Sequence, residues 1–151
     1  MSDERGYCAV ALMDPKTEMN MGSALRACGI YGAAMMVVQG MRFKKCATDT
    51  MKAWRHLPVI ETDSLRDSIP FDCVPVAVEL TPSARSMVGY THPERAFYIF
   101  GPEDSSLGEK TLSWCRDVIY VPTNGCMNLA ACVNVVLYDR MAKQLLRRAN
   151  V

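Results

Sequence analysis

The chain has 151 residues, of which 50% are hydrophobic and 22% are charged, a balance typical of an ordinary soluble protein. This length suits one domain with a sizeable buried core, and we expect residues 1–151 to form that single domain. The formal net charge of +1 excludes a strong attraction of the whole molecule to nucleic acid. Any RNA binding must therefore rely on local basic patches, such as residues 42–45 or the tail 143–148.

Apolar runs and helical segments alternate along the chain. Strands are predicted at residues 7–13, 33–38, 74–80, 96–100 and 118–121, and helices at 21–28, 47–54, 64–67, 107–115 and 128–146. Several of the strands are almost continuously apolar, which is typical of strands buried on both faces. The order predicts an α/β fold, with a mostly parallel sheet and helices on both faces.

The cysteines and the start of the chain give expectations about location. Seven cysteines are present and none forms a CxxC pair, so we interpret them as reduced thiols in a cytoplasmic protein. Residues 2–5 are polar or charged, and no apolar run approaches the roughly 18 residues that suggest a membrane span. We expect neither a targeting signal nor a membrane segment.

The first segment with candidate chemistry follows the first strand and contains Asn20, Gly22 and Arg26. Asn20 can cap the helix that begins there, and Gly22 allows another chain or a ligand to approach its first turn. Arg26 can reach back over the helix start with a charged fork suited to phosphate. The same spacing also fits a capped helix with a solvated arginine.

The second segment begins where the strand at 96–100 ends in Gly101 and Pro102. The sharp turn leaves Glu103 beside the carboxyl end of the strand, where open sheets bind ligands. By itself this segment fits a tight turn before a helix better than a site.

The third segment opens the last helix at Asn128, whose amide offers both hydrogen-bond donors and an acceptor. The small residues Ala130 and Ala131 allow close packing against other backbone. The alternative interpretation of Asn128 is an N-cap of that helix.

Together and in this order, the three segments resemble the SpoU or TrmH branch of the SPOUT methyltransferase superfamily. The family's Asn-x-Gly-x-x-x-Arg motif is complete at Asn20, Gly22 and Arg26, and its Phe-Gly-x-Glu motif is met by Phe100, Gly101 and Glu103. The Gly-Leu pair that follows is Ser106-Leu107 here. The third motif keeps its asparagine at Asn128, while Cys126 and Ala130 replace two serines.

The resemblance implies a deep trefoil knot, in which the carboxyl-terminal helix is threaded through a loop. It also implies that S-adenosylmethionine (AdoMet) bends into a crevice, where backbone groups and apolar side chains such as Ile119, Val121 and Leu129 contact the adenine. The implied cofactor residues are Glu79, Leu80, Thr81, Phe100, Gly101, Pro102, Glu103, Ile119, Tyr120, Val121, Pro122, Met127, Asn128 and Leu129.

The catalytic residues implied by the resemblance are Arg26, Asn20, Glu103 and Asn128. Arg26 would bind phosphate and stabilise the developing alkoxide. It would not serve as the base, because a guanidinium keeps its proton. Asn20 would position Arg26 or the ribose, and Glu103 would orient the arginine or the motif backbone. No metal is required, and both His56 and His92 are isolated from any metal-ligand spacing.

The implied function is AdoMet-dependent methylation of an RNA ribose 2'-hydroxyl by a homodimer, with tRNA as the first choice of substrate and rRNA as the second. The resemblance also implies that one subunit's Arg26 meets the RNA near the other subunit's pocket. The alternative is a non-catalytic RNA-binding or regulatory protein that keeps the cofactor-binding fold. The altered third motif favours this alternative, whereas the intact Asn20 and Arg26 oppose it.

Overall fold

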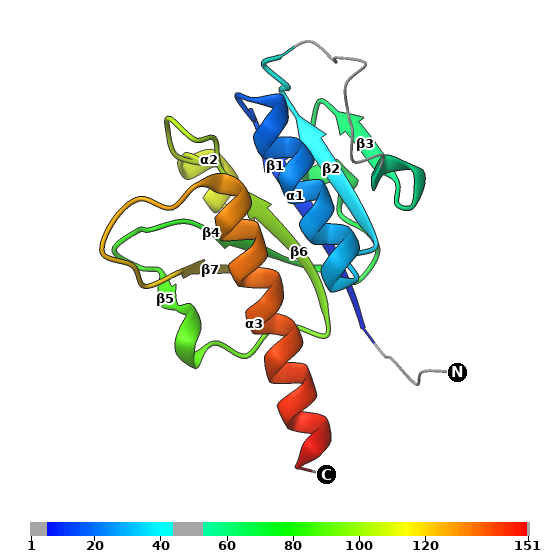
Figure 1. Ribbon diagram of the computed structural model, residues 1–151. Coiled ribbons are helices and arrows are strands. Elements are labelled where there is room, and N and C mark those ends of the chain that lie inside the picture. The colour runs from blue at the N-terminus through cyan, green and yellow to red at the C-terminus, as the bar shows by residue number, and fades with distance from the viewer. Residues whose placement is uncertain (1–5, 44–52, 151) are drawn as a thin grey trace.

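The computed structural model describes residues 6–43 and 53–150, which fold around one parallel sheet (Figure 1). Its seven strands lie in the order β3-β2-β1-β6-β4-β7-β5, and every neighbouring pair is parallel. The strands are β1 (Tyr7–Met13), β2 (Met35–Gln39), β3 (Val59–Thr62), β4 (Val74–Val78), β5 (Arg85–Ser86), β6 (Arg95–Phe100) and β7 (Asp117–Tyr120). The predicted parallel sheet is confirmed.

Two strands were absent from the sequence-based prediction, and both lie at an edge of the sheet. At one edge β3 has four residues, of which Ile60 and Glu61 are exposed. At the other edge β5 has only two residues, Arg85 and Ser86. Edge strands are covered on fewer sides than central ones, so their sequences need not carry the continuous apolar run that identifies a buried strand.

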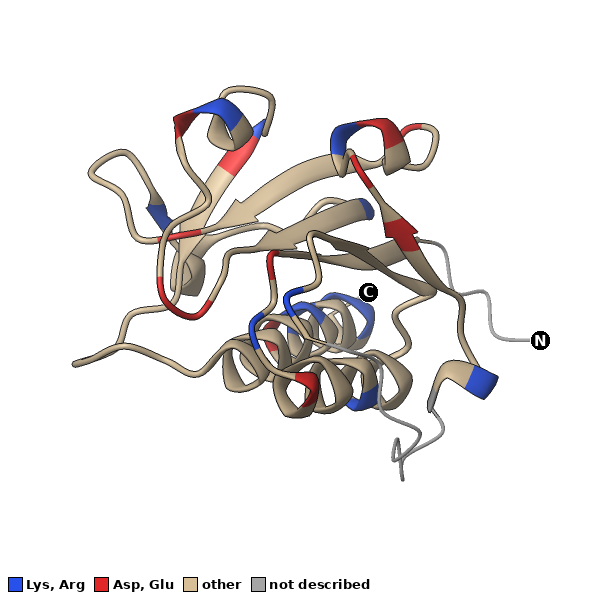
Figure 2. Ribbon diagram, turned by 90° about the horizontal axis from the view of Figure 1, so that it is seen from above, with Lys and Arg blue, Asp and Glu red and all other residues tan. Residues whose placement is uncertain are grey.

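Two long helices, α1 (Glu18–Tyr31) and α3 (Leu129–Ala149), lie side by side on one face of the sheet (Figures 1 and 2). The opposite face carries the short helix α2 (Glu109–Leu112) and the 3-10 turn η2 (Arg66–Ser68), seen above the sheet in Figure 2. Helices therefore cover both faces, but unequally. None of the helices in the described residues is both long and apolar enough to cross a membrane.

Three predicted helices differ from the structure. The helix predicted at 107–115 shortens to α2, which begins after Gly108, a glycine with a positive φ of 82°. The helix predicted at 64–67 is the turn η2, because side-chain hydrogen bonds among Thr62, Ser64 and Ser68 close a local turn instead. Most of the helix predicted at 47–54 lies outside the described residues. Its last two residues belong to the 3-10 turn η1 (Ala53–Arg55).

The hydrophobic core has two layers, because successive residues of a strand point to opposite faces. Val10 and Leu12 of β1 pack toward α1 and α3, whereas Ala9 and Ala11 pack toward the short elements with Leu65. All four of these β1 residues are fully buried, which explains the continuous apolar run in the sequence.

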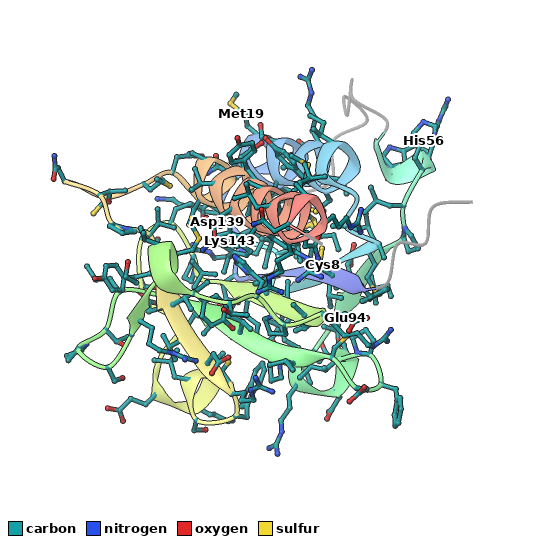
Figure 3. The ribbon with its side chains drawn as sticks, turned by 90° about the horizontal axis from the view of Figure 1, so that it is seen from below. Cys8, Met19, His56, Glu94, Asp139 and Lys143 are labelled. Atoms are coloured by element: carbon teal, nitrogen blue, oxygen red, sulfur yellow. The ribbon has the colours of Figure 1, made fainter. Side chains whose placement is uncertain are left out.

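A buried polar cluster joins α3 to β6 and to the segment before it. The His92 ring lies between the hydroxyl of Tyr98 (2.6 Å) and the carboxylate of Asp139 (2.8 Å). The ammonium of Lys143 lies 2.7 Å from the same carboxylate, and Figure 3 shows Asp139 and Lys143 close together on α3. Arg140, only 5% exposed, donates to the carbonyls of residues 93 and 94. These directional bonds fix how α3 is rotated against the sheet.

The histidine of this cluster predicts a pH-dependent contribution to stability. Burial lowers the pKa of His92 below its ordinary value of 6.5, although the hydrogen bond and charge of Asp139 raise it. Because the unfolded state then binds more protons, the free energy of unfolding should fall as the pH drops below about 6.5. Urea denaturation across pH should show a smaller fall for His92→Gln than for the wild type. An identical pH dependence in both proteins would contradict this, and His56→Gln, at an exposed position, is the control.

Candidate active site

Three strand ends that lie side by side form one edge of the sheet. The central strand of the three is β4, which pairs with β6 on one side and β7 on the other. Val78 lies opposite Phe100 in one pair and opposite Ile119 in the other. Since all three strands are parallel, the segments 79–81, 101–103 and 121–122 leave the sheet at the same edge, as in the ligand crevices of open α/β sheets.

The predicted cofactor residues differ in what they present at this edge. The Leu80 side chain is 76% exposed, whereas the side chains of Ile119 (0%) and Leu129 (6%) are buried in the core. The expectation that Ile119 and Leu129 contact adenine stays a prediction, and the burial of both side chains favours a contact through their backbone atoms. Their backbone atoms remain at the edge, beside the half-buried Val121.

A chain of side-chain hydrogen bonds joins the three sequence motifs. The amide nitrogen of Asn20 donates to Oε1 of Glu103 (2.8 Å), and its amide oxygen accepts from Nδ2 of Asn128 (3.0 Å). The second carboxylate oxygen of Glu103 accepts from the backbone N–H of Lys16 (2.9 Å). Asn20 thus meets Glu103, which lies 83 positions away in the sequence, and Asn128, which lies 108 positions away. This confirms that the motifs converge.

Asn128 fills both of the roles that its sequence allowed. Its Oδ1 accepts from the backbone N–H groups of Ala130 (2.9 Å) and Ala131 (3.2 Å), so it is the N-cap of α3. Its Nδ2 donates to Asn20 at the same time. The cap therefore ties the start of α3 to the first turn of α1.

Asn20 itself is not the cap of α1, contrary to the prediction. The N-cap is Thr17, whose hydroxyl oxygen accepts from the backbone N–H of Asn20 (3.2 Å). Thr17 satisfies the helix start, so both ends of the Asn20 side chain are available for Glu103 and Asn128. The sequence signal was present, since threonine is a favoured N-cap residue.

Glu79 links two of the segments that leave the sheet at this edge. One of its carboxylate oxygens accepts from the backbone N–H of Leu107 (2.9 Å), which links the end of β4 to the segment after β6. Gly101 lies against this contact, and a Cβ at Gly101 would stand 3.3 Å from Cγ of Leu107. Glycine is therefore the residue that allows this close approach.

Arg26 lies apart from the hydrogen-bond chain. Six residues along a helix correspond to about 9 Å of rise, so Arg26 is almost two turns beyond Asn20. Its side chain is exposed and makes no hydrogen bond or ion pair within residues 6–43 and 53–150. Within one chain, Glu103 orients Asn20 and the Lys16 backbone rather than Arg26.

The Glu103 carboxyl is held in its charged form. Partial burial raises its pKa, but the hydrogen bond from Asn20, backbone N–H groups and the nearby Arg42 lower it more, so the net pKa lies below its usual value. An ionised Glu103 can only accept hydrogen bonds, which fixes the amide of Asn20 with its nitrogen toward the carboxylate. No group of three or more metal-binding side chains occurs within the described part of the chain.

The hydrogen-bond chain predicts that Asn20→Asp lowers the free energy of unfolding by about 1–3 kcal/mol, because a carboxylate then faces Glu103 and a donor is lost. Adding Glu103→Gln should restore much of this loss, since the glutamine amide can donate to Asp at position 20 and accept from the Lys16 N–H. Urea denaturation of the single and double variants measures the coupling. Additive losses would contradict the geometry, and Asn124→Asp, an exposed loop position, controls for the added charge.

Comparisons with known proteins identify the family and similar folds. The profile of the SpoU rRNA Methylase family matches residues 7–138. The SpoU methyltransferase AviRb from Streptomyces viridochromogenes has a solved structure with a TM-score of 0.81 and 16% identity, covering 95% of this chain and 62% of its own. A second structure of AviRb, in complex with AdoMet, gives a TM-score of 0.80 at 15% identity, with 96% and 63% covered.

A shorter protein has a similar fold along its whole length. Its structure was solved for insights into the 2-OH methylation of C/U34 on tRNA. The TM-score is 0.77 at 21% identity, and the match covers 95% of this chain and 99% of the other. No curated protein sequence matches the chain. The chain spans less than two thirds of AviRb, and at these identities the solved structures show the fold. The profile match covers most of the sequence, and the chain belongs to the SpoU rRNA Methylase family.

Proposed function

We propose that this protein is an AdoMet-dependent RNA methyltransferase that modifies a ribose 2'-hydroxyl. The observation that carries the proposal is the hydrogen-bond chain through Asn20, Glu103 and Asn128, which joins the family's three motifs beside three parallel strand ends. Family membership supports RNA methylation, and the AviRb complex supports AdoMet as the methyl donor. The tRNA-related structure, which this chain covers almost completely, favours tRNA over rRNA as the substrate.

The residues at the sheet edge fit an adenosine with an attached amino acid. Leu80 and Val121 offer apolar side-chain surface, and the backbone around Gly101 and Tyr120 offers donors and acceptors. We propose that these groups, with residues 127–129 at the start of α3, hold AdoMet. Bound there, AdoMet would supply the activated methyl group, and no metal is needed for its transfer.

Arg26 and the motif asparagines have different proposed tasks. The Arg26 guanidinium stays protonated, so it would grip an RNA phosphate and stabilise negative charge that develops on the ribose oxygen. Asn20, held by Glu103 and Asn128, would keep the first turn of α1 at a fixed distance from the crevice. Holding the reacting groups in line can lower the barrier by several kcal/mol, up to about 7–11 in ideal cases.

The exposed face of α1 supports the proposed homodimer. Met19 (81% exposed) and Ile30 (63% exposed) lie on the same helical face as Arg26, at the spacing of one face of a helix. Figure 3 shows Met19 pointing away from the sheet, and Tyr138 of the adjacent α3 is 54% exposed. We propose that these apolar side chains pair across two copies, so that one subunit's Arg26 meets the RNA near the other subunit's crevice.

Three further expectations stay proposals. The fold likeness to SpoU methyltransferases supports a trefoil knot in which α3 is threaded through a loop. We retain a single domain for residues 1–151. The six cysteines in the described residues are all free, which supports a reducing, cytoplasmic location.

Replacing Arg26 by alanine should lower the rate of methyl transfer at least about 100-fold while leaving AdoMet binding unchanged, because the guanidinium acts only on the acceptor and on developing charge. Radiolabel from AdoMet captured with unfractionated tRNA measures transfer, and calorimetry measures cofactor binding. Arg66→Ala, an exposed arginine on the opposite face, is the matched control. Undiminished methyl transfer by Arg26→Ala would contradict the role proposed for Arg26.

The same assay separates the enzyme from the non-catalytic alternative. That alternative is favoured by the replacement of two motif serines by Cys126 and Ala130. Label that enters RNA supports the methyltransferase. Cofactor binding without transfer to tRNA or rRNA supports a binding protein.

The dimer predicts a particle of twice the chain mass at micromolar concentration by size-exclusion chromatography with light scattering. Met19→Asp should shift the equilibrium toward monomer, because it places a charge within the apolar face of α1. The control is Ser83→Asp, an exposed position far from α1 in sequence. A monomeric wild-type protein would contradict the dimer.

A further inference from the structure

The turn that carries Glu103 is only partly held by burial, since Pro102 is buried but the two residues after it are not. Glu103 and Asp104 are both exposed, and so are Lys16 and Thr17 in the loop between β1 and α1. Yet the carboxylate of Glu103 meets both the Lys16 N–H and the Asn20 amide at hydrogen-bond distance. A further contact joins these two surface segments, beside the 4.0 Å approach of the Lys16 ammonium to the Asp104 carboxylate.

Arg42 makes that contact. Its guanidinium donates two hydrogen bonds to the carboxylate of Asp104, with Nη1 at 3.0 Å from Oδ2 and Nη2 at 2.8 Å from Oδ1. Its Nε donates to the carbonyl of Asp14 (3.0 Å), and its backbone N–H donates to the carbonyl of Pro15 (3.2 Å). One residue therefore grips the turn after β6 and the loop after β1 together.

The segment before Arg42, at the end of β2, is itself held by close contacts. The Asp14 N–H donates to the carbonyl of Gln39 (2.7 Å), which joins the ends of β1 and β2. Gly40 has a φ of 69°, and a Cβ there would collide with the Asp14 carboxylate. Because β2, β1 and β6 are neighbours in the sheet, Arg42 extends from the end of β2 past β1 to the turn after β6.

These contacts favour a local role over a contribution to global stability or a contact with RNA. The side chains of Arg42 (39%) and Asp104 (43%) are well exposed, and exposed ion pairs stabilise a fold only slightly. Arg42 opens a basic run in the sequence, but three of its guanidinium N–H groups already donate to protein oxygens. Hydrogen bonds from Arg42 hold the pKa of Asp104 below its usual value, which keeps the carboxylate charged.

We propose that Arg42 and Asp104 are positioning residues for the methyl-transfer reaction. Their ion pair fixes the turn at 101–104 against the loop at 14–17, and so keeps Glu103 in contact with Asn20. The fork geometry is needed, since a lysine ammonium cannot bind both carboxylate oxygens and a carbonyl in one plane. The effect on catalysis rests on the proposed function, whereas the effect on loop position does not.

The test uses Arg42→Lys and Asp104→Asn, with Arg66→Lys and Glu109→Gln as controls that make the same changes at exposed positions elsewhere. Hydrogen exchange of the Lys16 amide reports the Glu103 contact directly, and both variants should speed it by about fivefold. Methyl transfer to unfractionated tRNA should show kcat lower by about fivefold with KM for tRNA unchanged. Amides in the centre of β1 should keep their wild-type exchange.

Two results would overturn the proposal. The first is unchanged exchange at Lys16 in both variants, whatever their activity. The second is a lower KM for tRNA with unchanged kcat in Asp104→Asn, because this would mean that Asp104 merely competes with RNA phosphate for Arg42. A wild-type protein that transfers no methyl group while the variants speed Lys16 exchange would refute the proposed function and support only the effect of Arg42 and Asp104 on loop position.

Discussion

The site depends on one carboxylate that must stay charged and correctly placed. Glu103 accepts from Lys16 and from Asn20, and Asn20 in turn accepts from Asn128, which caps α3. The donor and acceptor of each hydrogen bond follow from Glu103, because an ionised carboxylate can only accept. A change at Glu103 would therefore reach the start of both long helices. This chain of bonds links the three motifs at the edge where the sheet brings them together.

The sheet makes that convergence possible. Parallel pairing sends the ends of β6, β4 and β7 to a single edge, and the adjacent order of these strands in the sheet comes from crossovers that no local pattern reveals. The middle of α3 is fixed separately, where Arg140 and Asp139 join the polar cluster around His92. The helix is thus held by its cap at one end and by its buried charges farther along. The exposed face of α1 is the one for which we propose pairing with a second copy.

Much of the fold could be predicted from the sequence, because buried parallel strands such as β1 have continuous apolar runs. The edge strands β3 and β5 could not, since partial exposure removes that pattern. For the site, the motif residues were identified by resemblance to a family, whereas Thr17 as the cap of α1 was readable but overlooked. The Arg42 to Asp104 pair spans 62 positions and no spacing rule joins them. The inward direction of Ile119 and Leu129 likewise depends on packing.

The central claim is that the bonded motif residues border one crevice for a methyl donor and an RNA ribose. A crystal structure of the protein with AdoMet tests it most directly. The account predicts the sulfonium between the segments 79–81, 101–103 and 121–122, with the Glu103, Asn20 and Asn128 side chains still bonded. AdoMet bound elsewhere, or those three side chains separated in the complex, would contradict it.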